Sequence, residues 1–167
     1  MRHLISLVVV LLVSITCKGL ERKEIAVSNL SMVVKTSTEQ IHWLYGAADF
    51  VTKNDDRMDC DASTMDESKT FTISNQVLYI DKGADDEDSF KIVSCTFTKS
   101  KVFADAGLSE NYRFVVKPIA DGKASAFTTF ITIEKITNAG KTKTIVTIPA
   151  IDEDGRLYSV AVYTKVG

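Results

Sequence analysis

The stretch Ala126–Ile148 reads AFTTFITIEKITNAGKTKTIVTI, and it contains two runs of strand-forming residues joined by a turn. Side chains that fit a half-buried, pleated surface fill both runs, Ala126–Ile136 and Thr142–Ile148. Between them the NAG sequence at 138–140 supplies a glycine, which reaches the positive φ that a tight hairpin needs. The stretch therefore predicts an antiparallel β-hairpin.

Further strand-like runs flank this hairpin, and turn residues such as Asp121-Gly122 and Asp154-Gly155 separate them. These runs are Phe71–Ile80, Phe90–Thr98, Tyr112–Lys117 and Arg156–Thr164. Because no helical pattern lies between the runs, parallel βαβ units are disfavoured. We expect an all-β fold, an antiparallel up-and-down meander that closes into a barrel and so covers its edges.

The segment 25–51 allows two interpretations. Ile25–Lys35 has the composition of a strand, while Ser37–Gln40 resembles a capping box ahead of apolar residues at near-helical spacing. That spacing predicts an α+β fold with one helix packed on a curved antiparallel sheet. In the other interpretation, which we favour, Ile41–Asp49 is the first strand of a barrel and pairs with the Phe71–Ile80 run.

The N-terminal segment has the organisation of a secretion signal. Arg2 and His3 precede an apolar run from Leu4 to Ile15, which is shorter than the about 20 residues that span a bilayer. With cleavage expected after Gly19, residues 1–19 are the signal peptide and residues 20–167 a single domain. We therefore expect a secreted, extracellular protein without a membrane span.

Charge and composition exclude several classes of protein. The chain of 167 residues has 20 Lys and Arg against 22 Asp and Glu, a net charge of −2, so no strong positive field exists to bind nucleic acid. Apolar residues make up 45% and charged residues 25%, which is typical of a globular protein and not of a disordered one.

Two cysteines, Cys60 and Cys95, follow the signal segment. In an oxidising compartment an even number predicts a disulfide, which would stabilise the fold by about 3–4 kcal/mol by closing a loop of roughly 35 residues. Two buried free thiols are the alternative. Asn29 opens an Asn-Leu-Ser sequence and is a candidate N-glycosylation site, which would make the protein a glycoprotein.

The residues give no pattern typical of catalysis. His42 is the one histidine after the signal segment, and no motif supplies it with a nucleophile or a metal-binding partner. The acidic groups at 85–88 and 152–154 lie at strand junctions and lack the glycine and glutamate positions of a calcium loop. We expect no enzyme activity, no catalytic residue, no cofactor and no metal site.

Three short patches resemble the arthropod lipocalins, a family of secreted barrels that includes the insect apolipoprotein D-like carriers. Trp43 is similar to the tryptophan that opens the first lipocalin strand, and Cys60-Asp61-Ala62 is similar to the family's Cys-x-Ala at the second. The stretch from Asp154 to Tyr163, with Tyr158–Tyr163 at its end, resembles the family's Asp-Tyr-x-x-Tyr-Ala-Val-Val-Tyr stretch. The resemblance implies a lipocalin-like barrel with Trp43 at its narrow end.

Several of the runs are apolar on both faces, so each face must be covered or must line a cavity. We expect a carrier that binds, sequesters and transports a small hydrophobic molecule in a barrel cavity. The residues expected to line it are Trp43, Tyr45, Tyr112, Phe114, Phe127 and Tyr158. The alternative is a secreted protein-interaction module, an inhibitor or effector, whose loops at 81–89 and 138–141 contact a partner around a filled interior.

Overall fold

The computed structural model describes residues 21–44, 60–101, 107–151 and 157–167, and for 42–44, 60–63, 151 and 157–158 it describes the backbone alone. The expected signal peptide, residues 1–19, lies outside these ranges. Within them the chain forms the following elements: β1 (Glu21–Ile25), η1 (a 3-10 turn, Val27–Asn29), β2 (Met32–Lys35), β3 (Thr38–Leu44), β4 (Cys60–Met65), β5 (Thr70–Ser74), β6 (Val77–Ile80), β7 (Asp88–Lys101), β8 (Leu108–Ala120), β9 (Lys123–Ala124), β10 (Thr129–Asn138), β11 (Lys141–Ile151) and β12 (Leu157–Val166). No helix in the described part of the chain has the length and apolar character needed to cross a membrane.

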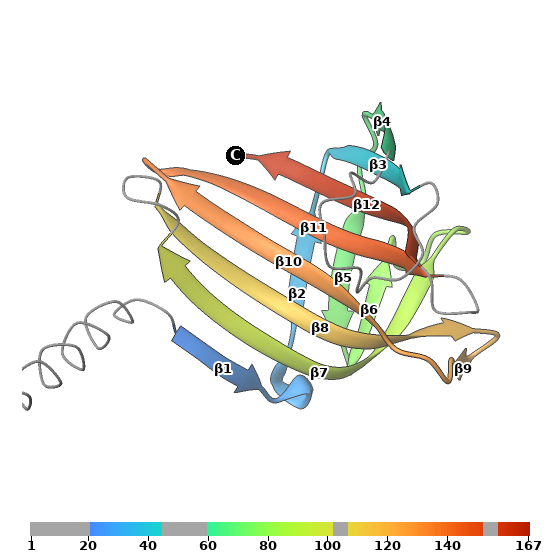
Figure 1. Cartoon of the computed structure of the whole chain (residues 1–167). Coiled ribbons are helices and arrows are strands. Elements are labelled where there is room, and N and C mark those ends of the chain that lie inside the picture. Colours follow the sequence, from blue (N-terminus) through green and yellow to red (C-terminus); the bar gives the residue numbers. More distant parts are fainter. Residues whose placement is uncertain (1–20, 45–59, 102–106, 152–156) are drawn as a thin grey trace, which may run out of the picture.

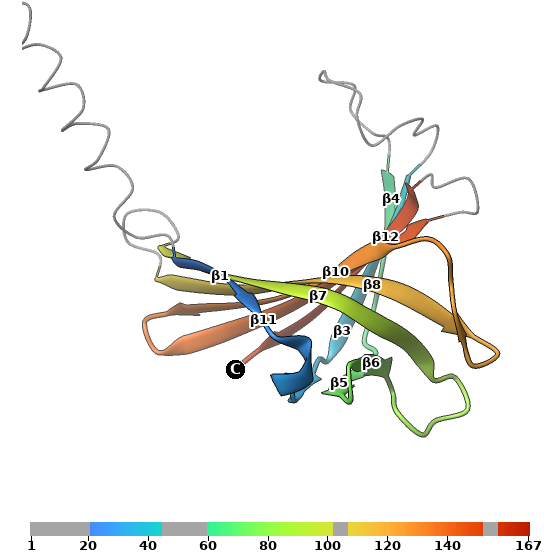
Figure 2. The same ribbon diagram turned by 90° about the horizontal axis from the view of Figure 1, so that it is seen from below.

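The strands form one antiparallel sheet with the order β2-β5-β6-β7-β8-β10-β11-β12-β3-β4. Two short strands lie off this order: β1 pairs with β7, and β9 pairs with β8. From β5 to β12 the order follows the chain, so the expected all-β, up-and-down antiparallel meander is confirmed. Its long central strands lie side by side in Figure 1. Seen from below in Figure 2, β5 and β6 turn out of the plane of β8 and β10, and the sheet curls into a half-barrel.

The run Phe71–Ile80, predicted as one strand, is two. Asn75 and Gln76 have φ of 51° and 64°, and they form the tight turn of the β5–β6 hairpin. Positive φ at both central residues gives a turn whose twist matches that of paired strands, and asparagine adopts this conformation more readily than most residues. The run Ile25–Lys35 is likewise divided, into the end of β1, the turn η1 and β2.

Residues 38–44 form the strand β3, as favoured above, whereas 45–49 of the expected strand lie outside the described residues. The predicted pairing was wrong: β3 pairs with β12 and β4, not with the Phe71–Ile80 run. The short strand β2 takes that place instead and pairs with β5. The N-terminal strands thus extend both ends of the meander, because the chain crosses from one end to the other between β2 and β3.

That crossing consists of two residues, Thr36 and Ser37. The Thr36 N–H donates to the Lys69 carbonyl oxygen at 2.9 Å, and the Ser37 N–H donates to the Thr164 carbonyl oxygen at 3.0 Å. Lys69 immediately precedes β5, and Thr164 lies on β12. The Thr36–Ser37 link therefore ties the two ends of the meander together and completes the barrel-like curl.

The concave face of the half-barrel holds a filled core. Side chains from neighbouring strands are buried there in cross-strand rows: Val34, Phe71, Ile73, Leu78, Ile80, Ile92, Cys95, Phe114, Val116, Ile131, Ile133, Val146 and Tyr163. Ile25, Val27, Leu30 and Met32 of the N-terminal segment pack against this cluster. The centre of the curl is thus occupied by the chain's own apolar side chains.

Candidate functional site

Two of the six residues predicted to bind ligand meet in this core. Tyr112 and Phe114 stack with their ring centroids 6.4 Å apart, and Tyr112 also contacts Phe97 at 4.9 Å. Phe114 has no exposed surface, and burial raises the pKa of the Tyr112 hydroxyl. Both aromatic rings pack in the interior of the sheet. Neither ring lines either of two pockets among the described residues, one between β2 and β10–β12 and one of about 390 Å³ beside the β5–β6 turn and β9.

The other four predicted residues do not join this cluster in the described part of the structure. Phe127 lies between β9 and β10 and is 44% exposed. The backbone of Trp43 pairs with Ser159, next to Tyr158, but the side chains of Trp43 and Tyr158 lie outside the described part. Tyr45 lies outside it altogether. A cavity lined by all six residues stays a prediction.

The expected disulfide between Cys60 and Cys95 is not seen, because Cys95 is a buried free thiol. Cys95 lies on β7 and pairs in register with Phe114 and Ile25. Cys60 begins β4, at the far end of the sheet order from β5 and β6. The sheet therefore puts the two backbones on strands that are not neighbours. Burial raises the pKa of the Cys95 thiol to about 11, so it stays protonated at neutral pH.

We expect Cys95 to resist alkylation in the folded protein, because reaction requires an exposed thiolate. Treating the native protein with iodoacetamide at pH 8 and mapping its peptides by mass spectrometry should show Cys95 unmodified. Labelling should become complete in guanidinium chloride without a reductant. A peptide pair linked through Cys60 and Cys95 in the unreduced digest would contradict the free thiol.

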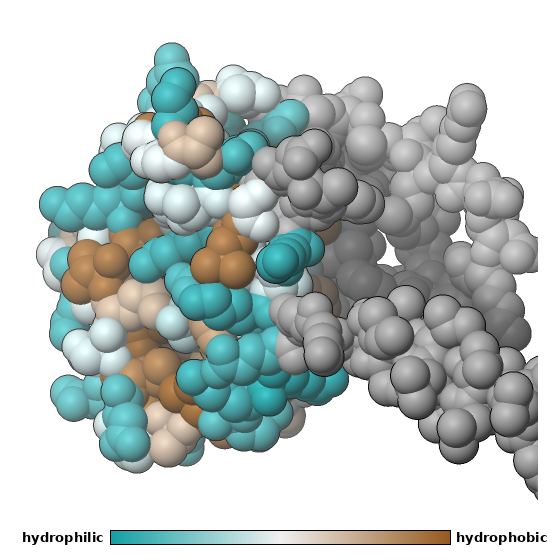
Figure 3. Space-filling view, turned by 90° about the vertical axis from the view of Figure 1, so that its left-hand side faces the viewer, coloured by the Kyte–Doolittle hydropathy of each residue, from teal (hydrophilic) through white to brown (hydrophobic). Residues whose placement is uncertain are grey.

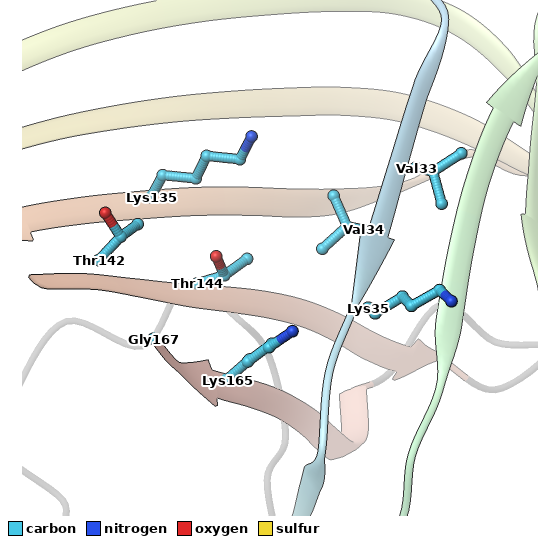
Figure 4. Close-up of a pocket in the computed structure, with 8 residues that line it drawn as sticks. All are labelled: Val33, Val34, Lys35, Lys135, Thr142, Thr144, Lys165 and Gly167. Atoms are coloured by element: carbon cyan, nitrogen blue, oxygen red, sulfur yellow. The ribbon is translucent and has the colours of Figure 1, made fainter.

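An open pocket of about 250 Å³ lies between β2 and the strands β10 to β12. Its lining combines three lysines, two threonines and the apolar edge of β2: Val33, Val34, Lys35, Lys135, Thr142, Thr144, Lys165 and Gly167. In Figure 4, Lys135 and Lys165 extend from β10 and β12 into the space in front of β2, while Lys35 points away from both. Figure 3 looks onto this end of the half-barrel, where hydrophilic residues lie around hydrophobic ones.

The lysines of the pocket belong to a row of polar residues across five strands. Register pairs join Lys99 to Glu110, Glu110 to Lys135, Lys135 to Thr144 and Thr144 to Lys165. The next row inward is apolar, with Tyr112, Ile133, Val146 and Tyr163 in register. The concave face thus changes from apolar to cationic at this end.

A second polar cluster lies beside the Thr36–Ser37 link. The Lys69 ammonium is half-buried and forms ion pairs with Glu67 at 2.9 Å, Asp81 at 3.1 Å and Asp86 at 3.2 Å. Asp81 also accepts a 2.7 Å hydrogen bond from the Thr70 N–H, at the start of β5. Lys69 thus connects the acidic loop after β6 to the place where the curl is tied.

Glu39 is a buried acid next to this cluster. Burial raises its pKa, and it is hydrogen-bonded to Tyr163 and to Glu67, whose own pKa is lowered chiefly by Lys69. The Tyr163 hydroxyl donates a hydrogen bond to the Glu39 carboxylate, and its pKa is raised chiefly by burial and then by this contact. Because folding raises its pKa, Glu39 contributes stability that is lost as the pH rises through its folded pKa.

The acidic loop at 81–89 is built around Lys69 and its own backbone. Besides the two aspartates that contact Lys69, the Glu87 carboxylate accepts a 2.7 Å hydrogen bond from the Gly83 N–H. Among the described residues no group of His, Cys, Asp and Glu is arranged to hold a metal ion. The acidic turn predicted at 152–154 lies outside the described residues.

Asn29, the candidate glycosylation site, is exposed on η1.

The lysines of the pocket were not predicted as site residues, although the sequence contains a signal for them. Ile131, Ile133 and Lys135 alternate along one strand, and Tyr163 and Lys165 do the same along another. A lysine that continues an inward-facing row at the end of a strand places its charge at the rim of the concave face. The Lys69 cluster has no comparable signal, because it joins segments far apart in the chain.

Comparisons of the chain with protein-family models, with curated proteins and with solved structures find no match. The resemblance to lipocalins thus stays a prediction from the residues.

Proposed function

We propose that the protein is a secreted carrier that binds a small molecule in the pocket between β2 and β10–β12. The observation that supports this best is the pocket itself, an open space at one end of an apolar, concave sheet. Its 250 Å³ is just below the range of about 300–1,000 Å³ typical of ligand sites, so the ligand is small. This site differs from the aromatic-lined cavity expected from the sequence.

The carrier proposal is tested by filling the pocket. Thr144 lines it from β11, and Thr147 lies on the opposite face of the same strand. We expect Thr144→Trp to abolish binding because the indole occupies the space, whereas Thr147→Trp leaves binding intact. The measurement is calorimetric titration of the full secreted protein with a panel of fatty acids, retinoids, porphyrin-like pigments and biogenic amines. No saturable binding by the unmodified protein, or equal binding by both variants, would contradict the proposal.

A protein-interaction module is the second candidate, and the filled core favours it. Phe114 and Tyr112 pack against their neighbours, and the centre of the curl holds no pocket among those described. Several apolar side chains are exposed, among them Val33 at 62% on β2 and Val166 at 70% on β12, and β2 is an end strand of the sheet. If the ligand panel gives no binding, this candidate becomes the preferred function.

A further inference from the structure

We propose that the pocket selects a small organic acid, with the carboxylate held between Lys135 and Lys165 and a short apolar body against Val34. This inference rests on the proposed carrier function and names the chemical class of its ligand. It is carried by three features of the pocket: the placement of two lysines, their lack of acidic partners among the described residues, and the apolar wall opposite them.

The register of the sheet places the two lysines on either side of one threonine. Lys135 pairs with Thr144, and Thr144 pairs with Lys165. Because neighbouring strands lie about 4.8 Å apart, the two lysine backbones are roughly 10 Å from each other. Both side chains extend into the same space in Figure 4, and the hydroxyls of Thr142 and Thr144 lie beside them. An anion in this space can accept hydrogen bonds from two ammonium groups and a hydroxyl.

The charges of these lysines are not neutralised within the described part of the protein. Neither Lys135 nor Lys165 has a carboxylate within 4.0 Å there, whereas Lys69 has three. Glu110 is the cross-strand neighbour of Lys135, but its carboxylate pairs with Lys99 at 3.1 Å. The row from Lys99 to Lys165 thus has three lysines and one glutamate. A bound carboxylate would reduce the repulsion between the two free ammonium groups.

The apolar wall of the pocket, on β2, determines the chemistry of the part of the ligand beyond its carboxylate. Val34 is buried and projects from β2 toward the lysines in Figure 4, and Lys35 points away. A purely polar anion such as inorganic phosphate would make no apolar contact with the part of Val34 that lines the pocket. A carboxylic acid with a short alkyl chain satisfies both the cationic row and the apolar wall, and it fits a volume of 250 Å³.

The test compares octanoate with 1-octanol, which has the same chain length without the charge. Calorimetric titration of the full secreted protein is carried out on the unmodified chain, on the double variant Lys135→Gln/Lys165→Gln, and on a control double variant, Lys141→Gln/Lys143→Gln. The control removes the same charge from exposed lysines outside this pocket. We expect the first double variant to bind octanoate about tenfold more weakly or worse, with octanol binding unchanged and the control variant unaffected. Lys135→Arg/Lys165→Arg should retain octanoate binding.

Several results would overturn the inference. Equal binding of octanoate and octanol, or equal weakening by both double variants, would mean that the two lysines do not select the acid. Inorganic phosphate binding as tightly as octanoate would exclude the apolar body. If octanol binds and Thr144→Trp blocks it while the lysine variants change nothing, the carrier function stands and only the ligand class is wrong. If no ligand binds at all, both fail.

Discussion

Replacing Phe114 by alanine is expected to lower the free energy of unfolding by about 3–5 kcal/mol, the typical cost of removing a large buried aromatic side chain. Phe114 has no exposed surface, it stacks on Tyr112, and it lies in register between Cys95 and Ile131, which are themselves fully buried. The space left by the ring cannot be filled by its neighbours without moving a central strand. Denaturant unfolding followed by circular dichroism measures the change.

Phe127→Ala is the matched control for this variant. Both phenylalanines were predicted to line a ligand cavity, but Phe127 is 44% exposed and lies outside the buried cluster. Its removal should cost less than about 1 kcal/mol, as for surface substitutions in general. Equal destabilisation by the two variants would contradict the packed core. A Phe114→Ala protein that keeps its stability and gains affinity for apolar ligands would instead restore the aromatic-lined cavity.

Lys69→Met is expected to destabilise the fold by about 2 kcal/mol. Breaking a fully buried ion pair typically costs about 3–5 kcal/mol, and the expected effect is smaller here because Asp86 and Glu67 are partly exposed. The variant leaves three carboxylates around one site without their cation, next to the buried Glu39. For a chain of this length such a change lowers the midpoint of thermal unfolding by roughly 4–8 °C. Lys91→Met, at an exposed lysine of β7, should leave the midpoint within about 1 °C.

The destabilisation by Lys69→Met should depend on pH. The Lys69 ammonium holds the pKa values of Glu67 and Asp86 below their usual range. Carboxyl groups with lowered folded pKa values stabilise the protein above their unfolded pKa values, and this contribution is lost as the pH falls through the folded ones. The two proteins should therefore differ most near pH 7 and converge below about pH 4. A difference that is constant from pH 7 to pH 3 would mean that the ion pairs contribute nothing.

The sequence predicted the strands where β-branched and aromatic residues alternate between turn residues, as in the β10–β11 hairpin at Asn138–Lys141. It did not predict the break in Phe71–Ile80, since Ser74-Asn75-Gln76-Val77 contains no glycine to mark a turn. The pairing partners of β3 were harder still to predict from the sequence. The apolar pattern of Ile41–Leu44 is satisfied equally beside β5 or beside β12, and the choice depends on where the Thr36–Ser37 link is held.

The candidate site was predicted less well than the fold for a related reason. Aromatic residues were assigned to a cavity because their chemistry suits a ligand, but the same chemistry suits a core, and Phe114 lies in the core. The pocket instead takes its character from Lys135 and Lys165, which sit at the ends of inward-facing rows. Which lysines lack an acidic partner depends on the register between strands, and single-chain patterns do not contain it.

The Thr36–Ser37 link also sets an order for biogenesis. Ser37 bonds through its backbone to Thr164, 127 residues later in the chain, and β3 has its place in the sheet only beside β12. As the ribosome makes the N-terminal strands first, β3 can pair early with β4, but the other edge of β3 must wait until β12 has been synthesised. Contacts of such long range are formed at a large entropic cost, so closure is expected to be the slow step of folding. Until then the chain exposes strand edges that can pair with other chains, and it depends on its folding environment to prevent aggregation.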